Sequence, residues 1–323
     1  KHTFTEVIVP AANATEAALV SGITVVGARH LRDVIAHCSI DTPDTLPATP
    51  ATTISDDWGE GVVRLEDIKG QEQAKRGLII AAAGRHNILM VGPPGTGKTM
   101  LARAFQNLLP PLSREEALEV MSIHSIVGNV SPDTITSQPP FRAPHHTASH
   151  TALVGGGTNP RPGEVTLAHH GVLFMDEFPE FDRRSLDALR QPLEDRVVSI
   201  ARVQGSAEFP ANFILVAALN PYRGVEDGTT DLARAMAETY KNKVSGPILD
   251  RIDLWLEVPH VDYDTLTTLK TSSGETEKAR RQISKARTAM AARLTARGVR
   301  TNANMSSRDI DETVILSEAV QEI

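Results

Sequence analysis

Residues 92–99 read Gly-Pro-Pro-Gly-Thr-Gly-Lys-Thr and match the pattern G-x-x-x-x-G-K-[ST] of a phosphate-binding loop. An apolar run at 87–91 predicts a buried parallel strand before the loop, and a helical pattern follows it at 100–109. In that setting the glycines let successive backbone N–H groups surround a β- or γ-phosphate, while Lys98 adds a positive charge and the Thr99 hydroxyl can bind Mg²⁺. The loop therefore predicts a nucleotide-binding α/β domain. The alternative, a glycine-rich turn with a chance Lys-Thr pair, is disfavoured by the strand and helix around it.

A second apolar strand is predicted at 171–175, and it ends in two adjacent acids, Asp176 and Glu177. Asp176 is placed to hold Mg²⁺ through water, as a Walker-B aspartate does. Glu177 is then placed to orient and polarise an attacking water. An acidic pair after a strand also commonly ends that strand at the surface. With the phosphate loop upstream, the catalytic interpretation becomes the expected one.

The bulk composition of the chain bounds its class. The 323 residues suffice for two domains, or for one large domain with appendages, and their composition is that of an ordinary soluble globular protein. No apolar run approaches the roughly 18 residues of a membrane span, and no signal peptide is visible. The single cysteine, Cys38, excludes an internal disulfide framework and fits a reducing cytosol. We therefore expect a cytoplasmic protein with no membrane partner.

Charge is unevenly distributed along the chain. The net charge is −7, so the whole molecule is not a polycation for nucleic acid. From Lys278 to Arg300, however, there are eight Lys or Arg residues and no acidic residue. This segment is either a solvated basic helix face or a surface that follows phosphates, and the first interpretation is somewhat favoured.

The sequence predicts four parts. Residues 1–40 form a small unit that buries little surface alone, with strands at 4–10 and 23–26 and helices at 11–20 and 30–37. Residues 41–62 have the Thr-, Pro- and Asp-rich composition of a linker. The nucleotide-binding core covers 63–260, with further strands at 197–200 and 213–219, and the helical pattern of 261–323 predicts the start of a helical lid.

An unusual segment, residues 137–170, separates the loop from the acidic strand. Its prolines and the glycine run at 155–157 exclude one regular helix, and a long structureless stretch inside a domain is usually functional. It contains five of the eleven histidines, His145, His146, His150, His169 and His170. A metal cluster is disfavoured, because adjacent histidines rarely direct both rings at one ion and no spacing here matches a zinc pattern.

A series of short motifs runs through the core in a fixed order, at 67–71, 92–99, 141–146, 162–164, 168–169, 172–177, 189–195, 218–221 and 246–253. With these motifs, about residues 65–260 closely resemble the magnesium-chelatase-like ComM/YifB group of AAA+ ATPases. The resemblance implies an AAA+ P-loop domain of three layers, αβα, with a β-hairpin before sensor 1 and an insertion in helix 2. Residues 1–40 resemble the end of that family's N-terminal domain, which has a Lon-protease-like (S5 domain 2-like) fold, and 261–323 a partial helical lid.

The resemblance also implies a function. It indicates a homo-hexameric ring that binds ATP and Mg²⁺ between subunits, moves on single-stranded or branched DNA and drives branch migration during natural transformation or recombination. Two alternatives without DNA remain open, a chelatase-type ATPase and a protein-remodelling ATPase. A proteolytic Ser/Lys pair would lie upstream of residue 1 or be missing, so the chain does not decide between them.

Residue roles follow from the same resemblance. Asn220 matches sensor 1, which orients the hydrolytic water, and Arg251 matches the arginine finger that reaches a neighbour's γ-phosphate. The alternative for Arg251 is a surface ion pair with Asp250 or Asp253. The expected catalytic set is thus Lys98, Asp176, Glu177, Asn220 and Arg251, with Thr99 and Asp176 on the metal. The expected nucleotide contacts are Ile68 and Gly70 near the adenine and, in the loop, Gly92, Pro93, Pro94, Gly95, Thr96, Gly97, Lys98, Thr99 and Met100.

The hairpin of the resemblance would run from Val197 to about Phe209, with its tip near 202–205. Arg202 sits where related helicases place a basic residue that contacts DNA, and an ordinary exposed arginine is an equal alternative. The sequence departs from the family at 222–243, where relatives carry several cysteines and this chain has none, so we expect no zinc. The histidines of 137–170 are expected in the helix-2 insertion, facing the ring pore. The N-terminal domain is expected to be only partly present, and the sensor-2 arginine to lie beyond residue 323.

Overall fold

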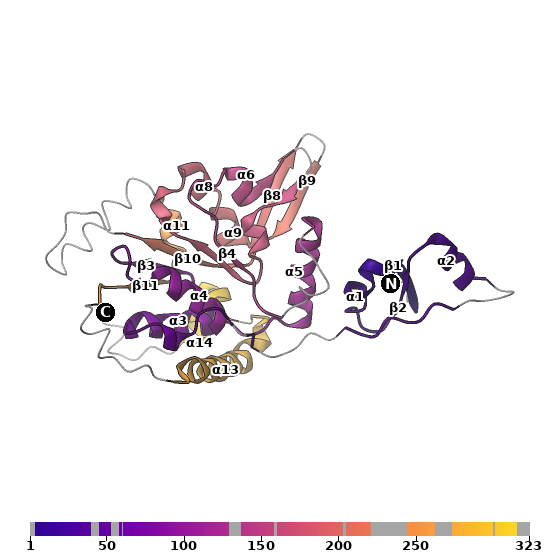
Figure 1. Ribbon diagram of the computed structural model, residues 1–323. Helices are drawn as coiled ribbons and strands as arrows, with labels where there is room; N and C mark the ends of the chain where they lie inside the picture. Colours follow the sequence, from indigo (N-terminus) through magenta and orange to yellow (C-terminus); the bar gives the residue numbers. More distant parts are fainter. Residues whose placement is uncertain are drawn as a thin grey trace. The chain divides into compact units, whose positions relative to one another are not determined.

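A computed structural model gives the fold (Figure 1). It describes residues 4–39, 45–52, 58–59, 61–128, 137–157, 160–202, 205–220, 244–261, 273–299 and 301–314. The chain forms two compact units, one of residues 1–57 with 112–137 and one of 58–111 with 138–323. Within the described residues, no helix combines the length and the apolar character that crossing a bilayer requires.

The first unit holds two parallel strands, β1 (Glu6–Pro10) and β2 (Thr24–Ala28), joined by a 3₁₀ turn (Ala11–Asn13) and the short helix α1 (Ala14–Ala17). Helix α2 (Leu31–His37) follows, and α5 (Arg114–Ile126) belongs to the same unit. The strand–helix–strand–helix order is the expected one, although the helix expected at 11–20 is shorter. Part of the expected linker also pairs with β2, because Thr49 donates its N–H to the Val25 carbonyl at 2.7 Å.

The second unit is built on a five-stranded parallel sheet with the order β11-β3-β10-β7-β4. The strands are β3 (Ile88–Val91), β4 (Phe141–Arg142), β7 (Val172–Met175), β10 (Ile214–Leu219) and β11 (Leu254–Glu257). Every residue of the three central strands is buried, which explains why each reads as an unbroken apolar run. The predicted mixed α/β fold with a parallel central sheet is therefore confirmed.

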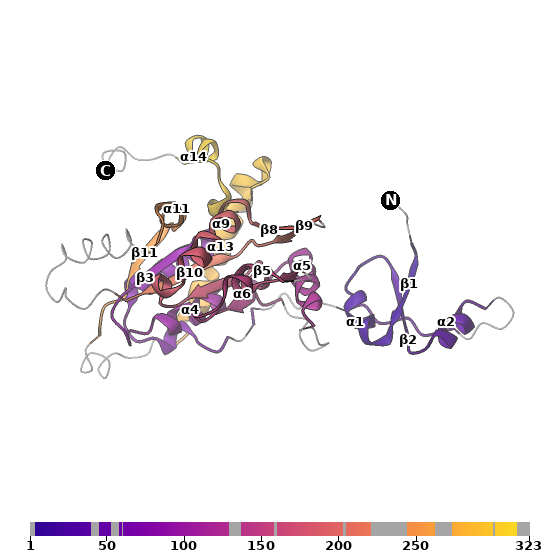
Figure 2. The same ribbon diagram turned by 90° about the horizontal axis from the view of Figure 1, so that it is seen from above.

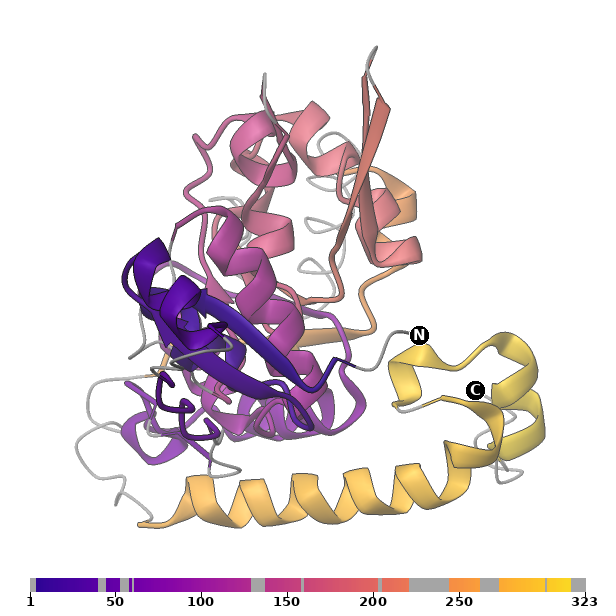
Figure 3. The ribbon, with the colours of Figure 1, turned by 90° about the vertical axis from the view of Figure 1, so that its right-hand side faces the viewer.

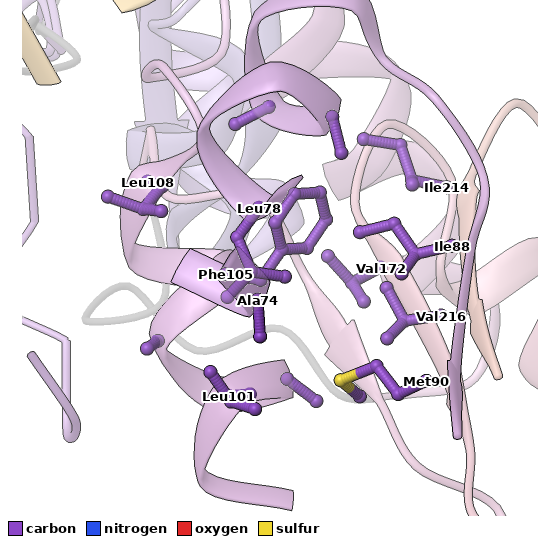
Figure 4. Packing of buried hydrophobic residues seen from close by; sticks show 14 of the residues in the cluster. Ala74, Leu78, Ile88, Met90, Leu101, Phe105, Leu108, Val172, Ile214 and Val216 are labelled. Carbon is purple, nitrogen blue, oxygen red and sulfur yellow. The ribbon is translucent and has the colours of Figure 1, made fainter. Parts of the chain in front are cut away.

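Helices cover both faces of this sheet (Figures 1 and 2). On one face lie α3 (Glu72–Gly84), α4 (Lys98–Leu108) and α13 (Glu275–Leu294). Figure 4 shows Phe105 of α4 facing Ile88 and Val172 of the sheet. On the other face lie α6 (His150–Val154), α7 (Glu164–Leu167), α8 (Arg183–Asp187), α9 (Arg190–Asp195) and α11 (Gly246–Leu249), with the 3₁₀ turn Phe178–Glu180.

The segment between the loop helix and β7 is not structureless. Besides β4, α6 and α7, it contains the small antiparallel pair β5 (Gly155–Gly156) and β6 (Arg161–Pro162). These elements are too short to give a periodic signal in the sequence. They owe their order to tertiary contacts such as the ion pair of Arg142 with Glu164, whose N–O distances are 2.6 and 2.7 Å.

A β-ribbon of β8 (Val197–Arg202) and β9 (Gly205–Pro210) projects from the sheet (Figures 1 and 2). Its register, from Val197 opposite Pro210 to Arg202 opposite Gly205, agrees with the hairpin bounds taken from the sequence. Val198 is buried in the core on the side of α6 to α9, so the ribbon belongs to that face. The side chain of Arg202 and residues 203–204 lie outside the described part, as do 221–243, where no zinc was expected.

The basic segment falls on α13 and the turn after it, and α13 runs beside α3 and α4 (Figure 3). In the described part of this segment, 278–299, four basic residues make internal contacts: Arg280 with Asn107, Arg287 with the Ala82 carbonyl, Arg293 with Asn302, and Arg297 with Asp309 and Glu312. The last two acids belong to α14 (Ser307–Thr313). These contacts favour the structural interpretation of the segment over a continuous phosphate-binding surface.

Arg280 is the centre of the contact between α13 and the core. Its guanidinium is buried and donates to the Asn107 carbonyl at 3.1 Å and the Gly59 carbonyl at 2.9 Å, and to the side chains of Asn107 and Glu277. It also lies over the Trp58 ring, 5.1 Å from the centroid. The Arg280 side chain thus joins α13, the expected lid helix, to α4 and to residues 58–59.

We predict that Arg280→Ala lowers the free energy of unfolding by about 2–4 kcal/mol, because it leaves several buried acceptors without a donor. The neighbouring Arg281→Ala, on the exposed face of α13, should change it by less than about 0.5 kcal/mol. Urea unfolding of both variants measures the difference. Equal midpoints would show that Arg280 does not hold α13 on the core.

Candidate nucleotide-binding site

The loop of residues 92–97 joins β3 to α4, as the sequence predicts. At Gly92 the backbone touches the Val258 carbonyl so closely that any Cβ would collide with it. Gly97 has φ +90°, a left-handed conformation that favours glycine, and it caps α4 directly before Lys98. The loop therefore ends at a helix N-terminus, where backbone N–H groups and the helix dipole favour an anion.

Lys98 ties the loop to the sheet. Its Nζ donates to the carbonyls of Gly92 at 2.7 Å and Pro93 at 2.8 Å, and to Oδ1 of Asn220 at 2.9 Å. Burial lowers the pKa of Lys98, and the nearby Asp176 carboxylate opposes that shift. Asn220 directly follows β10, the strand beside β3, so the expected sensor-1 residue and the loop lysine meet at the same edge of the sheet.

Thr99 and Asp176 form the second link. The Thr99 hydroxyl donates to Oδ2 of Asp176 at 3.2 Å, and Asp176 follows β7. Oxygen ligands from a hydroxyl and a carboxylate are those that Mg²⁺ prefers. The donor set expected for a metal is thus assembled by the fold.

Glu177 follows Asp176 in a left-handed conformation, with φ +50°, which is uncommon for a residue with a side chain. Its carboxylate oxygen Oε2 lies 2.8 Å from Nδ1 of His146. Sequence reasoning expected His146 in a pore-facing insertion, and missed this contact. The strand that places His146, β4, has only two residues, so the sequence carries no periodic signal that would have predicted the contact.

The expected adenine segment lies beside the loop. Ile68 is buried in the core, and Gly70 has φ +68°. Gln71 donates from Nε2 to the Pro259 carbonyl at 2.7 Å, and the residue before Pro259, Val258, donates its N–H to the Val91 carbonyl at 2.7 Å. These bonds place residues 68–71 next to the end of β3.

Arg251 is the one expected catalytic residue that the fold places elsewhere. Its carbonyl accepts from Nδ2 of Asn87 at 2.8 Å, and Asn87 precedes β3, so Arg251 lies at the amino edge of the sheet. Its guanidinium pairs with Glu194 at 2.9 Å. The alternative from the sequence, a surface ion pair with Asp250 or Asp253, therefore named the wrong acid. Asp253 instead accepts the N–H of Asn87 at 2.8 Å.

The architecture is that of a P-loop domain, with a parallel sheet covered by helices on both faces and a glycine-rich loop between a buried strand and the helix that carries Lys98 and Thr99. Residues 64–266 match the family described as magnesium chelatase, subunit ChlI. The chain belongs to this magnesium-chelatase-like family of AAA+-type ATPases, in its ComM/YifB group.

Individual relatives agree with this assignment. The chain is 42% identical to the competence protein ComM of Haemophilus influenzae, over 97% of this chain and 61% of that protein. It is 46% identical to the uncharacterized protein YifB of Escherichia coli, over 79% of this chain and 50% of that protein. A magnesium-chelatase 67 kDa subunit of Heliobacterium mobile is 28% identical over 70% of this chain and 38% of that protein. The chain thus spans about three-fifths of the length of the ComM protein that it resembles.

Proposed function

We propose that this chain binds Mg·ATP and hydrolyses it as part of a ring-forming AAA+ motor that acts on DNA. The observation that carries the proposal is the meeting of Lys98 with Asn220 and of Thr99 with Asp176 at one edge of the sheet. A phosphate loop, an acidic strand end and a polar strand end are together the parts that phosphoryl transfer requires. The ComM/YifB membership of the chain supports the same reaction.

In this proposal the loop binds the triphosphate. The backbone N–H groups of 95–99 surround the phosphates, and Lys98 exchanges its contacts with the loop carbonyls for contacts with phosphate oxygens. Thr99 and Asp176 would hold Mg²⁺, which would supply positive charge to offset that of the phosphates. Glu177 accepts a proton from the attacking water, and Asn220 helps to orient that water.

The position of Arg251 supports action between subunits. It lies at the amino edge of the strands, whereas the chain's own phosphate loop lies at their carboxyl edge. An arginine finger there acts on the site of a neighbouring copy rather than on its own. We therefore propose a homo-oligomeric ring, hexameric as the family resemblance implies, in which Arg251 completes the neighbour's site.

The DNA part of the proposal rests on the β8–β9 ribbon and on the relatives. The ribbon projects from the core with Arg202 in its last pair before the tip. The identity to a protein named for competence, 42%, exceeds the 28% identity to a magnesium-chelatase subunit. The ribbon and the higher identity to the competence protein support DNA over a chelatase partner as the substrate of the motor. We propose that the motor acts in the cytoplasm, which agrees with the single cysteine of the chain.

Two substitutions test the ATPase. Glu177→Gln should keep nucleotide affinity and abolish turnover, because it removes the proton acceptor and leaves the phosphate loop intact. Lys98→Ala should lose both, since it removes the positive charge at the phosphates. Nucleotide affinity from fluorescence titration and phosphate release measure these effects. Equal affinity of wild type and Lys98→Ala for ATP would contradict the site assignment.

A mixing experiment tests the ring. Arg251→Ala should bind ATP normally yet hydrolyse it about 10³–10⁵-fold more slowly. Mixing it with Lys98→Ala should restore part of the activity, because each variant supplies the half of the interface that the other lacks. Absence of rescue in rings shown to contain both variants would argue against action in trans.

A third pair of variants tests DNA binding by the ribbon. Arg202→Ala should leave basal ATP hydrolysis unchanged and weaken its stimulation by DNA. An arginine that binds phosphate reads no base, so the weakening should be similar for all sequences, and the salt slope should fall by about one unit for each arginine–phosphate pair removed. The control is Arg76→Ala, at an exposed position of α3 on the opposite face of the sheet from the ribbon.

The measurement is the ATPase rate against the concentration of forked DNA at several salt concentrations, with casein as the comparison substrate. An Arg202→Ala protein that DNA stimulates as strongly as wild type would make Arg202 an ordinary surface residue. Stimulation of the wild type by casein and not by DNA would replace the DNA motor with a protein remodeller.

A further inference from the structure

The carboxylate of Glu177 is held by a residue that follows a neighbouring strand, His146 after β4. The backbone of Glu177 is fixed on both sides, since its N–H donates to Oδ1 of Asp176 at 2.9 Å and its carbonyl accepts from Glu180 at 2.7 Å. The side chain is about half exposed, at 47%, and these backbone bonds leave its torsions free. The contact of its Oε2 with Nδ1 of His146, at 2.8 Å, is what restricts them.

His146 is itself well placed by its surroundings. It follows β4, which pairs with β7 through Phe141 opposite Val172, so the chain leaves both strands at the same edge of the sheet. The ion pair of Arg142 with Glu164 fixes β4 to α7. The His146 ring also packs against that of the preceding histidine, with 4.2 Å between the centroids. The imidazole therefore reaches Glu177 from an anchored segment rather than from a loose loop.

We propose that His146 is a positioning residue for ATP hydrolysis, which donates a hydrogen bond to one oxygen of Glu177 and so aims the other at the attacking water. The proposal rests on the ATPase function proposed above. A general base acts only when it lies within hydrogen-bonding distance of the proton that it takes. A group that orients the base raises the fraction of molecules in that geometry, as the third member of a nucleophile–base–orienter set does.

The position of the donor on the ring gives the proposal a specific form. The contact uses Nδ1, the ring nitrogen nearer the backbone. The amide nitrogen of asparagine can occupy nearly the same position, whereas the amide of glutamine reaches about as far as Nε2. If positioning is the role, asparagine should replace His146 far better than glutamine, although glutamine is closer to it in size.

The test compares four variants of the full chain. His146→Ala and His146→Gln should lower kcat by about 10- to 100-fold, with KM for ATP and nucleotide affinity unchanged, because a misdirected base affects the reaction and not binding. His146→Asn should recover at least half of the wild-type kcat. His145→Phe is the matched control, because it keeps a ring beside that of His146 and removes only the contact of His145 with the Thr147 hydroxyl at 2.9 Å, and it should retain the wild-type basal rate.

Each result decides the proposal. An unchanged or raised kcat in His146→Ala would overturn it, the raised value because His146 would then restrain Glu177 instead of aiming it. Equal kcat values for His146→Asn and His146→Gln would overturn it as well, because the position of the donor would not matter. A change in KM for ATP with kcat unchanged would also overturn it, because His146 would then affect binding and not the reaction. If wild type and Glu177→Gln are equally inactive under all conditions, the ATPase proposal fails first, and with it this one.

Discussion

The register of three parallel strands is the constraint on which the rest of the site depends. In β3, β7 and β10, Val216 of the middle strand lies opposite Ile88 on one side and Phe174 on the other. All three strands therefore end at the same edge, and the polar residue after each one is delivered there. The contact between Lys98 and Asn220 joins residues 122 positions apart, and it exists because of this alignment. Both faces of these strands are buried, so side-chain packing holds the register, since a slip would move each side chain out of the space that it fills between sheet and helices.

Much of this arrangement could be predicted from the sequence. Unbroken apolar runs identify buried strands, and a glycine-rich loop with Lys98 and Thr99 identifies the phosphate site, because both signals are local. The partner of an exposed charge is not a local property. Arg251 pairs with Glu194 on α9, which no spacing in the sequence indicates. His146 was missed for a related reason, because β4 has only two residues, Phe141–Arg142, and gives no periodic signal of the strand that places it.

The short elements between β4 and β7 connect the nucleotide edge with the β8–β9 ribbon. The chain runs from His146 into α6, whose N-terminus is capped by the Ser149 hydroxyl, and then into β5. At Gly155 of β5, a Cβ would lie 3.4 Å from Cδ1 of Ile200 on β8. The segment between β4 and β7 therefore packs beside the β8–β9 ribbon. Packed residues therefore lie between the ribbon and the segment that holds Glu177. If a substrate on the ribbon affects hydrolysis, as the proposed function requires, this contact is the place to test for coupling.

The two ends of the central sheet carry complementary halves of the proposed reaction. The phosphate loop and Glu177 lie at the carboxyl ends of the strands, and Arg251 lies at the amino end of β3, beyond its bond to Asn87. A strand of four residues such as β3 separates these ends by about 13 Å. Buried strands cannot shorten, so no movement within one copy brings Arg251 to its own loop without breaking the sheet. If Arg251 acts in hydrolysis, a second copy must present it, and the separation that keeps it from its own site is then what makes turnover depend on assembly.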